Sequence, residues 1–151
     1  MKKDNILKIF PKWGRIFKVE ADITVKKLHA TKNMNVFHFT KGGQNGALGN
    51  RIPNLNINGR DGKMVIVSSV SGDQKHRKYF PFDLNTKYHV VIQQYEENGK
   101  IMFQIIVNGD VKDYVENTQP QDFDNVKVYL SNPWMEPLSS EYGVVENFKF
   151  E

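Results

Sequence analysis

The chain contains 151 residues, a length typical of one domain with a core of its own, and we take residues 1–151 as a single domain. Its 21 Lys and Arg residues outnumber its 17 Asp and Glu residues, so the formal net charge is +4 and the protein is moderately basic. The chain has no cysteine, which excludes a disulfide framework, a thiolate metal site and a cysteine nucleophile, and its 12% aromatic residues argue against a disordered chain.

The opening segment does not match a signal peptide. Asn5, Lys8 and Pro11 interrupt its apolar run before a secretory core could form, and the rest of the chain offers no apolar run that could span a membrane. We therefore leave the compartment open, with a preference for an extracellular protein or an excised domain of a secreted protein. Residues 4–10 are also the one stretch whose apolar spacing approaches that of a helix.

Residues 17–25 are the clearest predicted strand. Phe17, Val19, Ala21, Ile23 and Val25 point to one side, and the polar residues between them point to the other. This alternation is typical of a half-buried antiparallel strand. Similar segments follow at 35–40, 54–58, 64–70, 78–82, 88–95, 101–108, 111–116, 126–131 and 144–150.

Short turn sequences separate these segments. Ser71-Gly72, Asn98-Gly99 and Asn108-Gly109 each place residues that tolerate positive φ between two extended runs, which is typical of β-hairpins. Many short strands at close spacing, without a repeat of constant period, predict an all-β sandwich or barrel.

The predicted hairpin at 88–109 carries a resemblance to a known superfamily. Its sequence reads YHVVIQQY, then NGK, then FQIIVNG, and it resembles the back half of the concanavalin A-like jelly rolls shared by galectins, laminin-G-like modules and pentraxins. The runs at 126–134 and 144–150 are similar to the closing strands of that fold, which pair with the N-terminal strand. The resemblance covers most of the chain and implies a single-domain antiparallel β-sandwich of jelly-roll type with a lectin-like, non-catalytic role.

The motifs of two branches of that superfamily are incomplete here. Galectins resemble one another in an H-F-N-x-R strand, of which this chain has Phe37-His38-Phe39 but Thr40 and Gly42 in place of the Asn and Arg. The β-glucanases carry an E-x-D-x-x-E strand, and no such strand occurs here. We therefore expect neither a galectin-type galactoside site nor an enzyme with catalytic residues. The scattered acidic residues also predict no metal site and no cofactor.

Two sequence features on either side of residue 40 are candidates for ligand contact. His38 points away from Phe37 and Phe39, so it is either a hydrogen-bonded strand histidine or a contact for a sugar. The Gly-rich segment 41–53 does not match a phosphate-binding loop, and it is either a structural loop or the rim of a binding site. In the second case Asn50 and Arg51 are its polar contributors.

Further candidates follow along the chain. Asn54, Asn56 and Asn58 share one face of a short strand, where carboxamides either bind sugar hydroxyls or simply face solvent. Trp134, between two prolines, is either a stacking platform for a sugar ring or a plug that closes the sandwich. The basic cluster 75–78 is interpreted as a solvated loop, with contact to acidic or sulfated glycans as the alternative; too few cations accompany it for nucleic-acid binding.

These observations favour a non-catalytic carbohydrate-binding domain. The expected partner is a glycan or glycoprotein, bound weakly on a concave sheet face and its rim loops, so that a homo-oligomer or tandem domains would raise avidity. The alternative function is a protein interaction or adhesion module on the same scaffold. The predicted ligand-binding residues are His38, Asn50, Arg51, Asn56, Asn58 and Trp134.

Overall fold

A computed structural model describes residues 3–151 of the chain, so Met1 and Lys2 of the predicted domain lie outside the described residues. These residues form β-strands joined by turns and loops, and none of them is helical. The first six strands are β1 (Ile6–Trp13), β2 (Phe17–Val25), β3 (Met34–Thr40), β4 (Asn54–Asn58), β5 (Lys63–Val70) and β6 (Asp73–Pro81). The remaining six are β7 (Lys87–Glu97), β8 (Lys100–Val107), β9 (Asp110–Glu116), β10 (Phe123–Tyr129), β11 (Glu136–Pro137) and β12 (Gly143–Phe150).

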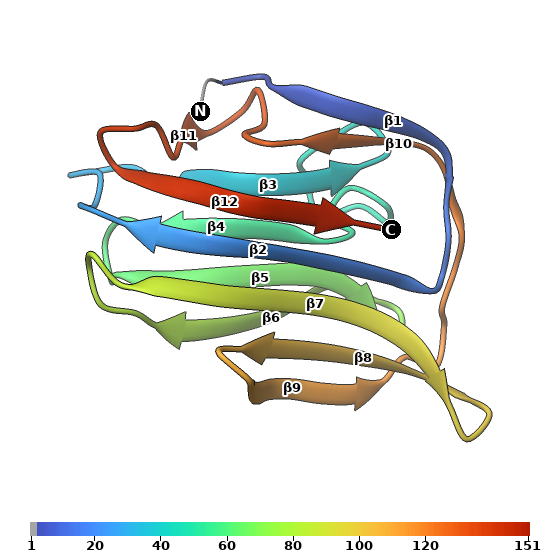
Figure 1. Cartoon of the computed structure of the whole chain (residues 1–151). Helices are drawn as coiled ribbons and strands as arrows, with labels where there is room; N and C mark the ends of the chain where they lie inside the picture. Colours follow the sequence, from blue (N-terminus) through green and yellow to red (C-terminus); the bar gives the residue numbers. More distant parts are fainter. Residues whose placement is uncertain (1–2) are drawn as a thin grey trace.

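The strands form two sheets that pack face to face as a sandwich (Figure 1). Sheet A has the order β1-β10-β3-β4-β5-β6, with the short β11 beside β3, and sheet B has the order β12-β2-β7-β8-β9. The final strand pairs with 17–25, the first strand that the sequence predicts clearly. This two-sheet antiparallel architecture confirms the predicted jelly-roll sandwich. In residues 3–151 no helix is long and apolar enough to cross a membrane.

The core lies between the sheets, where the alternating apolar residues meet. In β2 every second side chain from Phe17 to Val25 is buried, as the alternation predicts. Sheet A contributes Phe37 and Phe39 from the opposite side, and sheet B adds Phe103 from β8. Burial of each such side chain contributes roughly 1.5–3 kcal/mol to folding, so these strands carry most of the driving force for the fold.

Two asparagine–glycine turns connect the hairpins of sheet B as predicted. Asn98 and Gly99 join β7 to β8 with φ values of 53° and 78°, and Asn108 and Gly109 join β8 to β9 with φ values of 51° and 82°. Positive φ at both central positions matches the twist of the flanking strands and is favourable for Asn-Gly. The two turns set the register of β7, β8 and β9.

Two predictions for individual segments are wrong, and one short strand was not predicted. Residues 4–10, the one stretch with helix-like spacing, contribute to strand β1, because Ile6 and the residues after it pair with β10 at the edge of sheet A. The basic cluster 75–78 lies within β6 rather than in a loop, since β6 begins at Asp73. The sequence also did not predict β11, which makes only a two-residue parallel pairing with β3.

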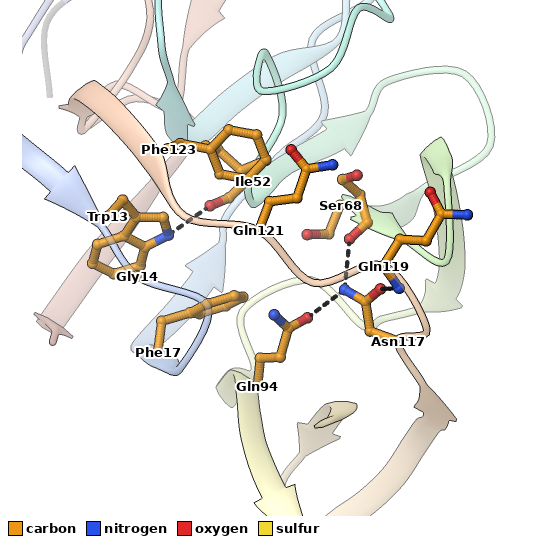
Figure 2. A pocket seen from close by; sticks show the side chains of 11 residues that line it. Trp13, Gly14, Phe17, Ile52, Ser68, Gln94, Asn117, Gln119, Gln121 and Phe123 are labelled. Atoms are coloured by element: carbon orange, nitrogen blue, oxygen red, sulfur yellow. Dashed lines mark hydrogen bonds between the residues drawn. The ribbon is translucent and has the colours of Figure 1, made fainter. Parts of the chain in front are cut away.

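Buried amides close one end of the sandwich, where the β1–β2 turn meets the segment that leads from β9 to β10 (Figure 2). Asn117 Nδ2 donates to Gln94 Oε1 at 2.9 Å, and Asn117 Oδ1 accepts from Ser71 N at 2.8 Å. Gln94 Nε2 in turn donates to Arg15 O at 2.7 Å. The cavity beside them has a volume of about 20 Å³, room for about one water molecule, so this end is a structural closure and not a ligand site.

Removal of the central amide of this closure should destabilise the fold. Asn117→Ala leaves the buried Gln94 oxygen and the Ser71 amide without partners, and we expect the free energy of unfolding to fall by about 1–3 kcal/mol. Urea denaturation measures the change. Gln119→Ala, an exposed substitution in the same segment, is the matched control and should stay within about 0.5 kcal/mol of the parent chain. Equal stability of the two variants would contradict this assignment.

Candidate functional site

The outer face of sheet A, which points away from sheet B, carries a groove of about 250 Å³. Strands β4, β5 and β6 form its floor, and the loop between β3 and β4 together with the segments around residues 33 and 135 form its walls. The lining residues are Asn33, Gln44, Arg51, Asn56, Asn58, Val65, Val67, Arg77, Tyr79 and Met135. The lining therefore combines amides, two arginines and an apolar strip, and it contains no carboxylate.

The register of sheet A arranges the floor of the groove in rows, because directly paired residues of antiparallel strands point to the same face. The first row runs from β3 to β6 through His38, Asn54, Val67 and Arg77. The second row runs through Asn35, Asn56, Val65 and Tyr79. Neighbouring rows lie about 7 Å apart along the strands, so the arginine of β6 and the tyrosine of β6 lie over different parts of the groove.

The apolar strip of the floor consists of two valines that face outward. Val65 and Val67 alternate with Met64 and Ile66, which point into the core. They are nevertheless only 9% and 3% exposed, because the surrounding side chains and the walls cover them. Tyr79, which pairs directly with Val65, is 50% exposed and supplies most of the accessible apolar surface in a mostly polar groove.

A network of buried amides lies directly beneath the groove. Asn35 Nδ2 donates to Asn54 Oδ1 at 2.9 Å and to Asn56 Oδ1 at 2.8 Å, while Asn35 Oδ1 accepts from Asn132 N at 2.8 Å. Asn132 Oδ1 then accepts from the backbone N–H groups of Trp134 and Met135. One buried asparagine of β3 thus joins the floor of the groove to the wall that contains Met135.

His38 extends this network to the other wall. Asn132 Nδ2 donates to His38 Nδ1 at 3.0 Å, so this ring nitrogen is the acceptor and Nε2 carries the proton that is donated to Asn50 O. The ring is fully buried, and burial lowers the pKa of His38 to about 4. His38 is therefore a neutral imidazole at physiological pH that ties the 41–53 loop to the loop after β10.

The 41–53 loop is organised by its own hydrogen bonds. Thr40 Oγ1 accepts from the backbone N–H groups of Gly42 and Gly43, and Asn50 Nδ2 donates to Asn45 Oδ1 at 2.7 Å. Arg51 Nε donates to Gln44 O at 2.8 Å, which places the guanidinium group along the groove wall. The loop is therefore a structured loop, and its residues Gln44 and Arg51 line the groove.

The structure separates the sequence-predicted site residues into three groups. Arg51, Asn56 and Asn58 line the groove. His38 and Asn50 are buried beneath it and bond to protein groups. Trp134 is 42% exposed and lines an adjoining hollow that shares Asn33 and Met135 with the groove, with its ring edge toward His38 at a centroid distance of 5.6 Å.

Sequence reasoning missed the contribution of β6 and of the buried amides. Arg77 and Tyr79 lie two residues apart on the outer face of β6, but the predicted strand began at residue 78 and Arg77 was assigned to a loop, so their common face was not recognised. Asn35 and Asn132 lie 97 positions apart in the chain. Only the polar residue at the start of the apolar run 34–39 signals the first of them, and nothing in the sequence pairs it with the second.

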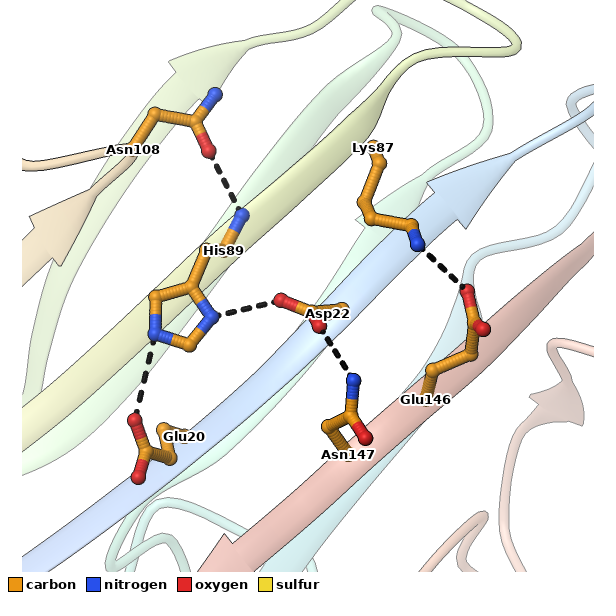
Figure 3. Close-up of polar contacts among 7 residues, drawn as sticks. All are labelled: Glu20, Asp22, Lys87, His89, Asn108, Glu146 and Asn147. Carbon is orange, nitrogen blue, oxygen red and sulfur yellow. Dashed lines mark hydrogen bonds and ion pairs between the residues drawn. The ribbon is translucent and has the colours of Figure 1, made fainter.

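A second polar cluster lies on the outer face of sheet B (Figure 3). His89 Nδ1 bonds to Asp22 Oδ1 at 2.6 Å, and His89 Nε2 lies 3.3 Å from Glu20 Oε2. Hydrogen bonds from Asn147 and then from His89 lower the pKa of Asp22. These groups satisfy one another across β12, β2 and β7, and within residues 3–151 no group of three His, Asp or Glu side chains is arranged to hold a metal ion. The cluster joins strands and is not our candidate site.

Comparisons with known proteins support the fold. A scan against protein-family models and a search of curated proteins give no match. Among solved structures, a heptameric SAP-like pentraxin from Limulus polyphemus matches with a TM-score of 0.58 and 14% identity, over 96% of this chain and 67% of that chain. The binding domain of botulinum neurotoxin serotype D matches with a TM-score of 0.61 and 13% identity, over 93% of this chain and 33% of that chain.

An enzyme has the same architecture. A family 7 alginate lyase in complex with its substrate matches with a TM-score of 0.60 and 13% identity, over 93% of this chain and 62% of that chain. The chain therefore has the concanavalin A-like jelly-roll fold that the hairpin at 88–109 predicted. The neighbours include both an alginate lyase and the binding domain of a neurotoxin, so function has to be argued from the groove.

The buried neutral His38 should make stability depend on pH. Its pKa of about 4 in the folded chain is below the ordinary value of 6.5, so only the unfolded chain binds a proton between these values. The stabilisation is complete above pH 6.5 and is lost as pH falls to about 4, by about 3 kcal/mol in total. Urea denaturation at several pH values should show this loss in the parent chain.

His38→Gln is the control for this pH dependence. The variant retains a donor for Asn50 O but cannot be protonated, so its free energy of unfolding should fall less between pH 7 and pH 4 than that of the parent chain. The carboxylates contribute equally to the pH dependence of the free energy of unfolding in the two proteins, so the difference between the two profiles reports on His38. Parallel pH profiles would show that His38 does not titrate as described.

Proposed function

We propose that this chain is a non-catalytic carbohydrate-binding domain whose ligand lies in the groove on the outer face of sheet A. The observation that carries the proposal is the combination in one groove of carboxamides, an apolar strip and an exposed tyrosine. Sugars need this combination, since their C–H faces pack on apolar surfaces and their hydroxyls exchange hydrogen bonds with polar side chains.

The polar groups of the groove fit hydroxyl ligands in number and in kind. Gln44, Asn56 and Asn58 line the groove with carboxamides, the neutral groups that exchange hydrogen bonds with hydroxyls. Asn56 and Asn58 supply amide N–H groups on the opposite side. The alginate lyase among the structural neighbours has the same fold and acts on a carbohydrate. This supports the proposal, whose main evidence is the groove itself.

We assign His38 and Asn50 to positioning the groove rather than to direct contact. His38 is sealed beneath the floor with both ring nitrogens engaged, so it neither meets the ligand nor accepts a proton from it. The lining also lacks the pair of carboxylates that most glycoside hydrolases use. The groove therefore lacks the residues for hydrolysis by a carboxylate pair, and we expect that incubation with a bound glycan releases no new chain ends.

A competing function is protein interaction through the edge of sheet A. Strand β1 exposes Ile6, Leu7 and Ile9, each between 44% and 53%, and this apolar edge is the specific observation in its favour. A glycan array separates the two functions. Binding to one class of glycan supports the groove, and a blank array with folded protein contradicts the proposed function and favours β1.

A substitution on β6 tests the location of the site. Tyr79→Ala removes the exposed ring beside Val65 and should weaken the affinity for the array's best glycan about tenfold, as measured by calorimetry. Tyr114→Ala on β9 of sheet B is the matched control, because Tyr114 is 46% exposed, and its affinity should equal that of the parent chain. Equal losses in both variants, or none in Tyr79→Ala, would place the ligand elsewhere.

A further inference from the structure

Two arginines of the groove have no carboxylate partner. Within residues 3–151, ion pairs engage Arg15, Lys27, Lys32, Lys78 and Lys87, whereas Arg51 and Arg77 take part in none. Many other cationic side chains of the described residues are also unpaired, but Arg51 and Arg77 line the same groove, whose lining contains no carboxylate. Two positive charges therefore share one partly covered space that an anion can enter.

The two guanidinium groups act on one another. Burial, and then the positive charge of Arg77, lower the pKa of Arg51. Two like charges that share a partly covered groove repel, and this repulsion is relieved when an anion lies between them. The Nε of Arg51 is engaged with Gln44 O, but its terminal nitrogens and the whole Arg77 guanidinium have no protein partner in the described residues.

A third cation approaches from the same strand. Lys75 precedes Arg77 by two residues and shares its outward face on β6. Its side chain lies against the 41–53 loop, because a Cβ atom added to Gly46 would come within 2.2 Å of Lys75 Cε. The first row of the floor therefore ends in a cluster of positive charge formed by Lys75, Arg77 and Arg51.

The three asparagines of the groove are oriented as donors. The Oδ1 atoms of Asn56, Asn58 and Asn33 accept hydrogen bonds from Asn35 Nδ2, Arg60 N and Gly59 N, respectively. No partner is recorded for their Nδ2 groups in the part of the chain that the structure describes. Three amides and two guanidinium groups thus present N–H donors, and the ligand that matches them is rich in acceptor oxygens.

We propose that the ligand of this groove is an anionic carbohydrate whose carboxylate or sulfate group binds between Arg51 and Arg77, while its uncharged part lies over Val65 and Tyr79. This inference rests on the proposed function and names its ligand class. This placement of the charged and uncharged parts follows from the register, since Arg77 is paired with Val67 in the first row and Tyr79 with Val65 in the second. An arginine fork binds either oxyanion with two parallel hydrogen bonds, and the amide donors bind the ring oxygens and hydroxyls of the neighbouring row.

The first experiment compares charged glycans with their neutral counterparts. Oligogalacturonate and its methyl ester test the carboxylate, and dextran sulfate and dextran test the sulfate, beside a broad array of neutral glycans. We expect binding to charged members only, with the better of the two oxyanions identifying the source of the charge. The affinity should fall as NaCl rises from 50 to 500 mM, because salt screens the attraction between the charges. The Debye screening length is about 10 Å at 0.1 M salt.

The second experiment uses variants of the groove with the bound probe. Arg77→Gln should weaken binding about tenfold or more, Arg77→Lys should recover part of the loss, and Asn58→Asp should weaken it as well, because it replaces a donor by a negative oxygen while keeping the bond to Arg60 N. Lys112→Gln on β9 removes the same charge from sheet B and is the control. It should leave the affinity unchanged.

The outcomes separate this inference from the proposed function. If neutral glycans bind as tightly as their charged counterparts, and Tyr79→Ala abolishes that binding, the groove is a carbohydrate site but the ligand is not anionic. If charged glycans bind but Arg77→Gln and Lys112→Gln weaken them equally, the attraction comes from net charge and the assigned site is wrong. If no glycan binds to the folded protein, the proposed function fails and this inference fails with it.

Discussion

The groove depends on one constraint, which is that polar side chains covered by loops must find hydrogen-bond partners inside the protein. Asn35, His38 and Asn132 are all fully buried beneath it. An unmet hydrogen bond at such a place costs about 1–3 kcal/mol, so the two loops that supply the partners are held in one arrangement. The arrangement in turn fixes where Arg51 and Met135 stand as walls. The binding surface is therefore shaped from below, before any ligand arrives.

The same network explains why the groove presents donors. The Nδ2 group of Asn35 donates hydrogen bonds to the side-chain oxygens of Asn54 and Asn56, and a backbone N–H group in the turn after β4 donates to the side-chain oxygen of Asn58. The N–H groups of Asn56 and Asn58 are left for a ligand. The lining also contains two arginines and no carboxylate. The hydrogen-bond donors and the positive charge, which come from different residues, therefore both favour a ligand with acceptor oxygens and negative charge. Consistency between independent levels of structure is a stronger argument than either level alone.

The sequence predicted the fold well wherever the pattern of burial is local. Strand β2 and the Asn98 and Asn108 turns follow from alternation and from the tolerance of Asn-Gly for positive φ, and neither needs a distant partner. Strand β1 was not predicted, because it is an edge strand that is exposed on both faces and its sequence therefore lacks the alternation of apolar and polar residues. The basic cluster was not recognised as part of a strand, because β6 is also an edge strand and its polar residues resemble those of a loop.

The site was only partly predictable for a related reason. Asn56, Asn58 and Arg51 were identified from the alternation of one short strand and the loop before it, which are local signals. Arg51 and Arg77 meet only because β3, β4, β5 and β6 lie side by side in this order, and Asn35 meets Asn132 only because β10 lies on the other side of β3. Sequence spacing carries no trace of such cross-strand neighbours. The chemical character of the groove, which is a property of rows across the sheet and not of any one strand, therefore becomes visible only once the register is known.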